Sequence, residues 1–162
     1  MKKLEYKTTI LEFNSVEELP ENDKKLMDMA MEAVKNAYAP YSKFCVGAAL
    51  LLENGIYVKG NNQENVAYPS GLCAERVAAF SASSQYPGVA ILSIAITAKS
   101  DSFIVDKPIS PCGSCRQVLA EYEHKQGKPI RIILSGAKGK VLVVEKVEDI
   151  LPLSFKEDKL KN

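Results

Sequence analysis

Two short segments hold the residues that could bind a metal ion and move protons. Residues 73–76 read CAER, and residues 111–116 read PCGSCR. Two cysteines with two residues between them fit on one helical turn and can bind a single metal ion. Structural zinc sites usually close with four protein ligands, whereas catalytic sites leave the fourth position for water. The three cysteines, Cys73, Cys112 and Cys115, therefore predict a catalytic zinc site.

Glu75 lies two residues after Cys73, at the predicted start of a helix. At that spacing its carboxylate can turn toward the open coordination position, accept a proton from water and hand it to a substrate. Three thiolates bring three negative charges to the metal, which should make that water less acidic. Arg76 and Arg116 stand beside the ligands, and helix N-termini carry partial positive charge. We therefore expect these two arginines to offset the thiolate charge.

Two alternative interpretations of the cysteines belong to other classes of protein. A structural zinc module that binds a partner needs no Glu75 and leaves no exchangeable position for water. A redox protein would instead use Cys112 and Cys115 as a dithiol. The fourth cysteine and the single histidine are not expected to add ligands to this cluster. Cys45 is expected to be an apolar strand residue, and His124 is expected to be a surface residue near a helix end.

The periodicity of apolar residues predicts the elements that position these groups. The expected order is helix, hairpin, helix, strand, helix, strand, strand, over residues 20–40, 44–52, 56–61, 73–84, 91–98, 111–125, 130–135 and 141–147. Asn54-Gly55 is a favoured hairpin turn, and Gly127 suits a helix end. Residues 4–13 give only a weak strand signal. Strands separated by helices favour parallel pairing in a sheet that helices cover.

The composition fits one globular domain without a large nucleic-acid surface. The 162 residues are 46% hydrophobic and 25% charged, and the formal net charge is +1. That balance argues against the clustered excess of Lys and Arg that nucleic-acid binding requires. No run of about 18 apolar residues occurs, and no apolar region follows the basic N-terminus, so we expect neither a membrane span nor a signal peptide. Clustered cysteines then indicate metal binding in a reducing cytoplasm.

The two zinc segments and four further motifs resemble the cytidine deaminase family, in its small homotetrameric branch. The further motifs are YSKF at 41–44, VGAA at 46–49, NQEN at 62–65 and ILPLSF at 150–155. The resemblance implies an α/β fold, a three-layer α-β-α arrangement with a mixed five-stranded sheet covered by helices. It also implies three parts of the chain: an N-terminal extension (1–19), a deaminase domain (20–155) and a charged tail (156–162).

The resemblance implies a role for each site residue. Zinc, one ion per chain, is bound by Cys73, Cys112 and Cys115, and Glu75 shuttles protons. The substrate is contacted by Phe44 (stacking on the pyrimidine), Asn62 and Glu64 (sugar hydroxyls), the backbone of Ala74 (base) and Phe155 (a neighbouring subunit's site). The implied reaction is hydrolytic deamination of cytidine and deoxycytidine to uridine and deoxyuridine, with release of ammonia, in pyrimidine salvage. The implied assembly is a homotetramer with shared active sites.

The chemistry of these residue types agrees with a nucleoside substrate. An aromatic platform suits a pyrimidine ring, and a neutral amide beside an acidic carboxylate disfavours a bound phosphate. A deaminase of the blasticidin type uses similar motifs and is the alternative. A deaminase that edits polynucleotides is disfavoured by the near-neutral charge. The loop at 99–110 is longer than the family pattern leads us to expect, and it could change the mouth of the site and the substrate range.

Overall fold

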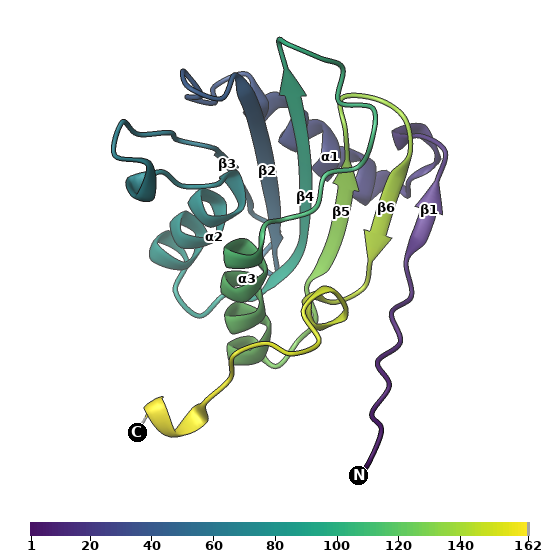
Figure 1. Ribbon diagram of the computed structural model, residues 1–162, viewed down its shortest axis with the longest axis vertical. Coiled ribbons are helices and arrows are strands. Elements are labelled where there is room, and N and C mark those ends of the chain that lie inside the picture. The colour runs from purple at the N-terminus through teal and green to yellow at the C-terminus, as the bar shows by residue number, and fades with distance from the viewer. Residues whose placement is uncertain (162) are drawn as a thin grey trace.

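A mixed sheet of six strands lies between one helix on its far face and two helices on its near face (Figure 1). The computed structural model describes residues 1–161. The strand order is β1-β6-β5-β4-β2-β3. The strands are β1 (Leu11–Phe13), β2 (Phe44–Leu52), β3 (Tyr57–Asn61), β4 (Ile91–Ser100), β5 (Arg131–Ser135) and β6 (Val141–Val144). The predicted three-layer fold is therefore confirmed.

Three helices cover the two faces of the sheet. They are α1 (Glu21–Val34), α2 (Ala74–Gln85) and α3 (Gly113–Gln126). The buried apolar residues form two clusters, one beneath α2 and α3 and one beneath α1, because the central strands are buried on both faces. Short 3₁₀ turns are η1 (Val16–Glu18), η2 (Tyr68–Ser70), η3 (Val147–Ile150) and η4 (Asp158–Lys161). Over residues 1–161, none of the helices combines the length and the apolar character needed to cross a bilayer.

The expectation of five strands is wrong by one. The additional strand is β1, which pairs antiparallel with β6 through Leu11 and Val143 at its first position. The weak strand signal at residues 4–13 is realised only in the last three residues, and residues 1–10 have no regular secondary structure. Since β1 lies at the edge of the sheet and its neighbour β6 has four residues, only a short part of this segment meets a backbone partner.

Parallel pairing is confined to the centre of the sheet. Strands β4 and β5 are parallel and are connected through α3, whereas every other pair in the sheet order is antiparallel. The hairpin between β2 and β3 turns at Gly55, which has a positive φ of 81° as the Asn-Gly signal predicted. Gly127 closes α3 in the left-handed conformation, also as predicted.

Two predicted helix boundaries differ from the structure. The first helix ends at Val34 rather than near Pro40, because the backbone of Tyr38 pairs with the segment after β3: its N–H donates to Asn62 O at 3.0 Å. Pro111 precedes the N-cap of α3 instead of lying in its first turn.

Two glycines allow helices to approach the hairpin closely. A Cβ atom on Gly60 of β3 would lie 2.5 Å from the carbonyl oxygen of Ala74 and 2.5 Å from the backbone nitrogen of Ala78, both in α2. A Cβ on Gly47 of β2 would lie 2.1 Å from the carbonyl oxygen of Ala30 in α1. Contacts below about 3 Å involve backbone atoms that cannot rotate away, so the packing of both layers requires glycine at these positions.

We predict that Gly60→Ala and Gly47→Ala each lower the free energy of unfolding by about 1–3 kcal/mol, the usual cost of overpacking. The matched control is Gly113→Ala, because a Cβ at Gly113 would meet no atom within 4 Å and its φ is not positive. Urea unfolding of the three variants measures this. Equal stability for the control and the two core variants would contradict the role of close helix packing.

Candidate active site

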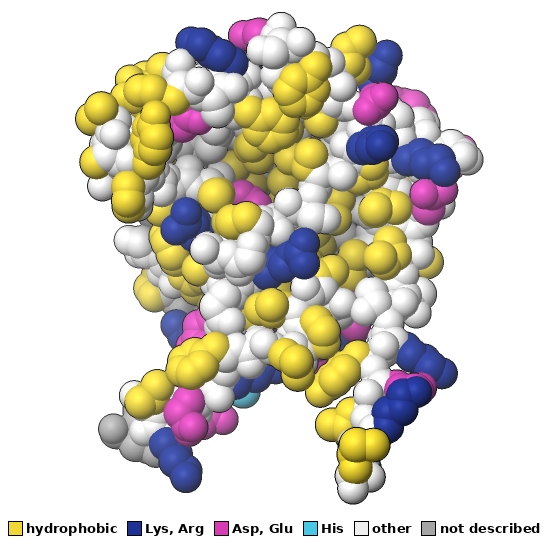
Figure 2. Space-filling model, viewed as in Figure 1, with side chains coloured by type: hydrophobic (Ala, Val, Ile, Leu, Met, Phe, Trp, Pro, Cys, Tyr) yellow, Lys and Arg dark blue, Asp and Glu magenta, His cyan; other side chains and the backbone are white. Residues whose placement is uncertain are grey.

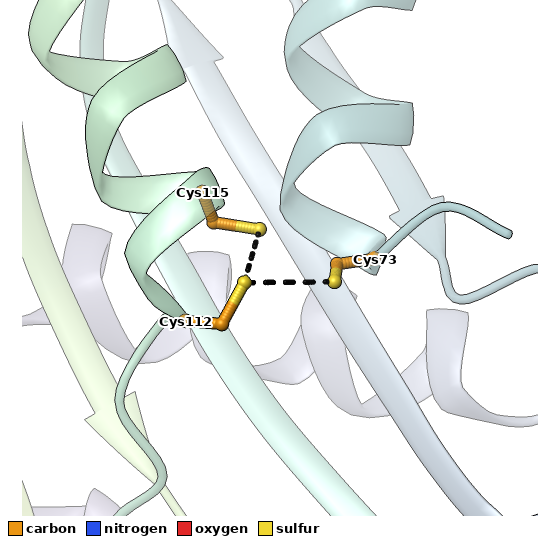
Figure 3. A group of neighbouring side chains, drawn as sticks. All are labelled: Cys73, Cys112 and Cys115. Atoms are coloured by element: carbon orange, nitrogen blue, oxygen red, sulfur yellow. Dashed lines mark hydrogen bonds between the residues drawn. The ribbon is translucent and has the colours of Figure 1, made fainter. Parts of the chain in front are cut away.

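Three cysteine side chains meet where α2 and α3 begin (Figure 3). Cys73 is the N-cap of α2, Cys112 is the N-cap of α3, and Cys115 lies in the first turn of α3. The Sγ of Cys112 lies 3.9 Å from that of Cys73 and 3.5 Å from that of Cys115, and all three lie within 4.8 Å of one another. Sulfurs bound to tetrahedral zinc at about 2.3 Å are separated by about 3.8 Å. The donor set and its spacing therefore fit zinc.

A cavity of about 940 Å³ opens beside the cysteines. This volume lies at the upper end of the range of about 300–1,000 Å³ typical of small-molecule sites. The lining is mainly apolar and is contributed by Tyr41, Ser42, Phe44, Val46, Asn62, Gln63, Glu64, Asn65, Tyr68, Gly71, Leu72, Cys73, Glu75, Arg76, Ile109, Ser110 and Cys112. The structure thus brings two of the three predicted ligands, the predicted proton shuttle and three predicted substrate contacts into one cavity.

Glu75 is buried within this cavity and lies in the first turn of α2. Its burial raises the pKa of its carboxyl group above the ordinary value, and the negative charge of Cys73 raises it further. The positive charge of Arg76 acts in the opposite direction. A carboxyl whose pKa is raised toward neutrality can both accept and release a proton, as general acid–base catalysis requires.

Arg76 and Arg116 have different partners, although both follow ligand segments. The Nη2 of Arg76 lies 3.8 Å from the Sγ of Cys73, and its buried Nε has no hydrogen-bond partner among the described residues. A hydrogen bond from Cys115 and, to a smaller extent, the Arg76 guanidinium lower the pKa of Cys73 to about 5. The Nε of Arg116 instead donates to the carbonyl oxygen of Pro111 at 2.8 Å, and its Nη1 donates to that of Ile150 at 3.1 Å.

The side chains of Asn62 and Glu64 hold the segment that precedes and begins β2. Asn62 accepts a hydrogen bond from the Val46 N–H at 2.8 Å and donates one to the Phe44 carbonyl at 2.9 Å. One carboxylate oxygen of Glu64 accepts a hydrogen bond from the Tyr41 N–H at 2.9 Å. Each side chain retains hydrogen-bonding capacity toward the cavity, because an amide offers four bonds and a carboxylate has two oxygens.

Phe44 lines the cavity from the first position of β2. It follows Lys43, which has a positive φ of 56°, a conformation that is uncommon outside glycine. The Phe44 N–H is held by the hydroxyl of Ser42 at 3.1 Å. The position of the phenyl ring in the cavity is therefore fixed by the backbone conformation of Lys43 and by the hydrogen bonds that Asn62 and Glu64 make to the backbone of residues 41–46.

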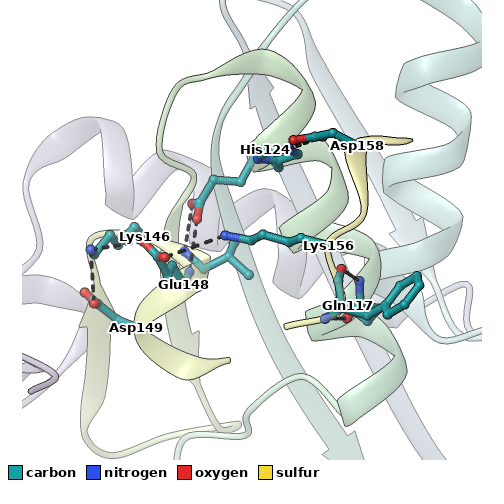
Figure 4. Close-up of polar contacts among 10 residues, drawn as sticks. Gln117, His124, Lys146, Glu148, Asp149, Lys156 and Asp158 are labelled. Carbon is teal, nitrogen blue, oxygen red and sulfur yellow. Dashed lines mark hydrogen bonds and ion pairs between the residues drawn. The ribbon is translucent and has the colours of Figure 1, made fainter. Parts of the chain in front are cut away.

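Phe155 lies outside the cavity, in the segment that follows η3. Its N–H donates to Gln117 Oε1 at 3.0 Å and its carbonyl accepts from Gln117 Nε2 at 2.9 Å, so α3 holds its backbone at two points (Figure 4). Its side chain is 69% exposed. His124 lies at the surface in the last turn of α3, as expected, and hydrogen-bonds to Asp158 at 2.8 Å. Asn162, the end of the charged tail expected at 156–162, lies outside the described residues.

Several further residues line the cavity and had no definite role assigned from the sequence. Tyr41 and Tyr68 meet edge to face with ring centroids 5.7 Å apart, and both line the cavity. Ile109 and Ser110 reach it from the long loop before α3. Tyr41 lies within the YSKF motif, so adjacency to Phe44 was the available signal. Tyr68 could be proposed from the sequence only as a residue of the site or of a subunit contact. The loop at 99–110 was expected near the mouth of the site, but only the fold shows that Ile109 and Ser110 are its residues that reach the cavity.

Comparison with known proteins agrees with this geometry. Residues 20–127 match the family described as the cytidine and deoxycytidylate deaminase zinc-binding region. The cytidine deaminase of Sporosarcina psychrophila is 40% identical over 138 residues, which are 85% of this chain and 93% of that protein. The blasticidin-S deaminase of Bacillus cereus is 26% identical over 141 residues, covering 85% of this chain and 94% of that protein.

The crystal structure of cytidine deaminase from Burkholderia pseudomallei is similar over most of both chains. It has a TM-score of 0.71 and 37% sequence identity, and the match covers 85% of this chain and all of that chain. The matched region of residues 20–127 contains all three clustered cysteines and Glu75. The resemblance stated from the motifs is therefore confirmed, and the chain belongs to the cytidine and deoxycytidylate deaminase family.

Proposed function

We propose that this protein deaminates free cytidine and deoxycytidine by hydrolysis, giving uridine or deoxyuridine and ammonia. The observation that carries the proposal is the meeting of a three-cysteine cluster, a buried glutamate and an aromatic wall at one cavity large enough to hold a nucleoside. The identity to cytidine deaminases over most of the chain supports the same activity.

Cys73, Cys112 and Cys115 would hold one Zn²⁺ ion per chain. Three protein ligands are the pattern of catalytic zinc, and no fourth cysteine or histidine of the described residues joins the cluster. When bound, zinc would supply Lewis-acid activation of a water molecule at neutral pH. A structural zinc module or a dithiol redox protein would have no use for a buried carboxyl beside the cysteines, so Glu75 favours the catalytic interpretation.

Glu75 would carry the protons of the reaction. Its carboxylate takes a proton from the attacking water and delivers it to N3 of the pyrimidine, which makes C4 electrophilic. A second proton passes through Glu75 to the departing amine, so that one water is consumed and one ammonia leaves. Burial keeps this exchange away from solvent, and the raised pKa of Glu75 matches both directions of transfer.

The remaining cavity residues would select a nucleoside. Phe44, Asn62 and Glu64 line the cavity, where Phe44 would offer its ring to the pyrimidine and the other two would bind the sugar. The backbone at Ala74, next to Cys73 at the start of α2, would read the base. Hydrogen bonds with Ser42, and with the Tyr41 backbone, lower the pKa of Glu64. A carboxylate that remains ionised at the sugar end repels a phosphate, which favours nucleosides over nucleotides.

The blasticidin-type activity is the weaker candidate. The relative with that name is 26% identical, compared with 40% for a cytidine deaminase over a similar share of this chain. Both activities would use the same cysteines and Glu75, so the choice between them depends on the walls of the cavity and on turnover measurements.

We further propose a cytoplasmic homotetramer that serves pyrimidine salvage, with residues 20–155 as its deaminase domain. Exposed apolar side chains support assembly, since large exposed patches mark contacts between proteins. Hydrophobic side chains gather over the segment between β3 and α2, where Val66 is 79% and Tyr68 is 74% exposed (Figure 2). Phe155, presented by Gln117, is the residue expected to reach a neighbouring subunit's site.

The first prediction concerns turnover. Purified protein mixed with cytidine should remove the cytidine absorbance band and release one ammonia per nucleoside, a zinc chelator should stop the reaction, and added Zn²⁺ should restore it. Blasticidin S is the comparison substrate. If protein verified to hold one zinc per chain leaves cytidine and deoxycytidine unchanged, the proposed function is wrong.

The second prediction concerns Glu75. Glu75→Gln should lower kcat by about 10²–10⁴-fold or more, because the amide cannot carry the proton between water and substrate. The zinc content should stay at the wild-type value. The matched carboxylate-to-amide control is Glu64→Gln, which should raise KM more than it lowers kcat. A Glu75→Gln variant that retains wild-type kcat would remove Glu75 from the proton pathway.

The third prediction separates Arg76 from Arg116. Arg76 lies beside Cys73 and its charge lowers the pKa of Glu75, so Arg76→Ala should move the acidic limb of the pH profile of kcat/KM to higher pH. Arg116→Ala should leave that limb in place and lower the free energy of unfolding by about 1–3 kcal/mol, because carbonyl groups lose a charged donor. Identical limbs for wild type and Arg76→Ala would exclude charge compensation by Arg76.

A further inference from the structure

The long loop between β4 and α3 is anchored to the fold at its centre. Val105 is 6% exposed, and its carbonyl accepts a hydrogen bond from the Ala137 N–H at 2.7 Å. The carbonyl oxygens of Val105 and Lys107 lie 2.5 and 2.7 Å from where a Cβ on Gly136 would sit. The loop backbone therefore packs into space that a glycine leaves open after β5, and Figure 1 shows the loop leaving the end of β4 and returning to the start of α3.

Just before this anchor, Phe103 extends back to β2 and stacks on Phe44. The two ring centroids are 6.1 Å apart and the ring planes differ by 23°. Phe103 is 58% exposed and is not one of the described residues that line the cavity, so it contacts Phe44 from outside. Stacked aromatic pairs at this separation hold each other in a preferred orientation.

Resting on the proposed function, we infer that Phe103 is a positioning residue that fixes the Phe44 ring as the platform for the pyrimidine. Phe44 stands at the first position of β2, opposite Ser100 at the last position of β4, and the ring that stacks on it comes from the loop that follows β4. A ring ordered before binding does not lose rotational freedom when the base stacks on it. The long loop thereby contributes to substrate affinity without touching the substrate.

This role has a distinct kinetic signature. A platform ordered in advance stabilises the bound substrate and the transition state equally, so its loss raises KM and leaves kcat unchanged. Phe103→Ala should raise KM for cytidine by about 3- to 10-fold, which corresponds to the loss of one aromatic pair. The factor should be the same for deoxycytidine, because Phe103 acts at the base end and not at the sugar end of the site.

The experiment compares four variants by steady-state kinetics and by calorimetric binding of uridine. Phe103→Tyr keeps the ring and should retain the wild-type KM. Phe103→Leu removes the ring but keeps an apolar side chain, so it should raise KM as Phe103→Ala does and keeps the test decisive if the alanine variant folds poorly. The matched control is Ile104→Ala, since Ile104 is the next loop residue, is 64% exposed and has no ring to stack. It should leave KM, kcat and uridine affinity at the wild-type values.

A double-mutant cycle tests whether the effect passes through Phe44. In a Phe44→Leu background, Phe103→Ala should no longer change KM or uridine affinity. The inference is overturned if Phe103→Leu and Phe103→Ala match wild type, if kcat falls with KM unchanged, or if the effect persists in the Phe44→Leu background. Each of these outcomes is compatible with an active wild-type enzyme, whereas failure of the proposed function would appear as an inactive wild type.

Discussion

The N-termini of α2 and α3 lie side by side on one face of the sheet, and the chemistry depends on that placement. It brings three thiols within 4.8 Å of one another and directs the positive ends of two helices toward them. The placement is itself a result of close packing, because Gly60 lets the first turn of α2 rest against β3 at backbone distance. A small displacement of α2 would move Cys73 away from the two cysteines of α3.

The same segments that carry ligands also carry the proton shuttle, so the site has few independent parts. Glu75 follows Cys73 on α2, and its burial is the largest cause of its raised pKa. Arg76, next along the helix, supplies a positive charge to both neighbours. The start of α2 therefore contributes one of the three proposed metal ligands, the acid–base group and a positive charge.

The opposite wall of the cavity is assembled from loops that hold one another. Asn62 and Glu64 bind the backbone around the start of β2, and Phe103 supports Phe44 from the far side. Side chains expected to contact the sugar thus also shape the base platform.

The residues proposed for the chemistry of this protein could be identified from local patterns in the sequence. The spacing of Cys73, Glu75, Cys112 and Cys115 on predicted helix starts is local information, and most element boundaries followed from apolar periodicity and from turns such as Asn54-Gly55. Contacts between segments distant in the chain depend on the fold and could not be predicted in this way. Local patterns do not encode which carbonyl groups accept hydrogen bonds from Arg116, or whether the three-residue strand β1 pairs with β6. They also do not encode that Phe103 of the long loop stacks on Phe44.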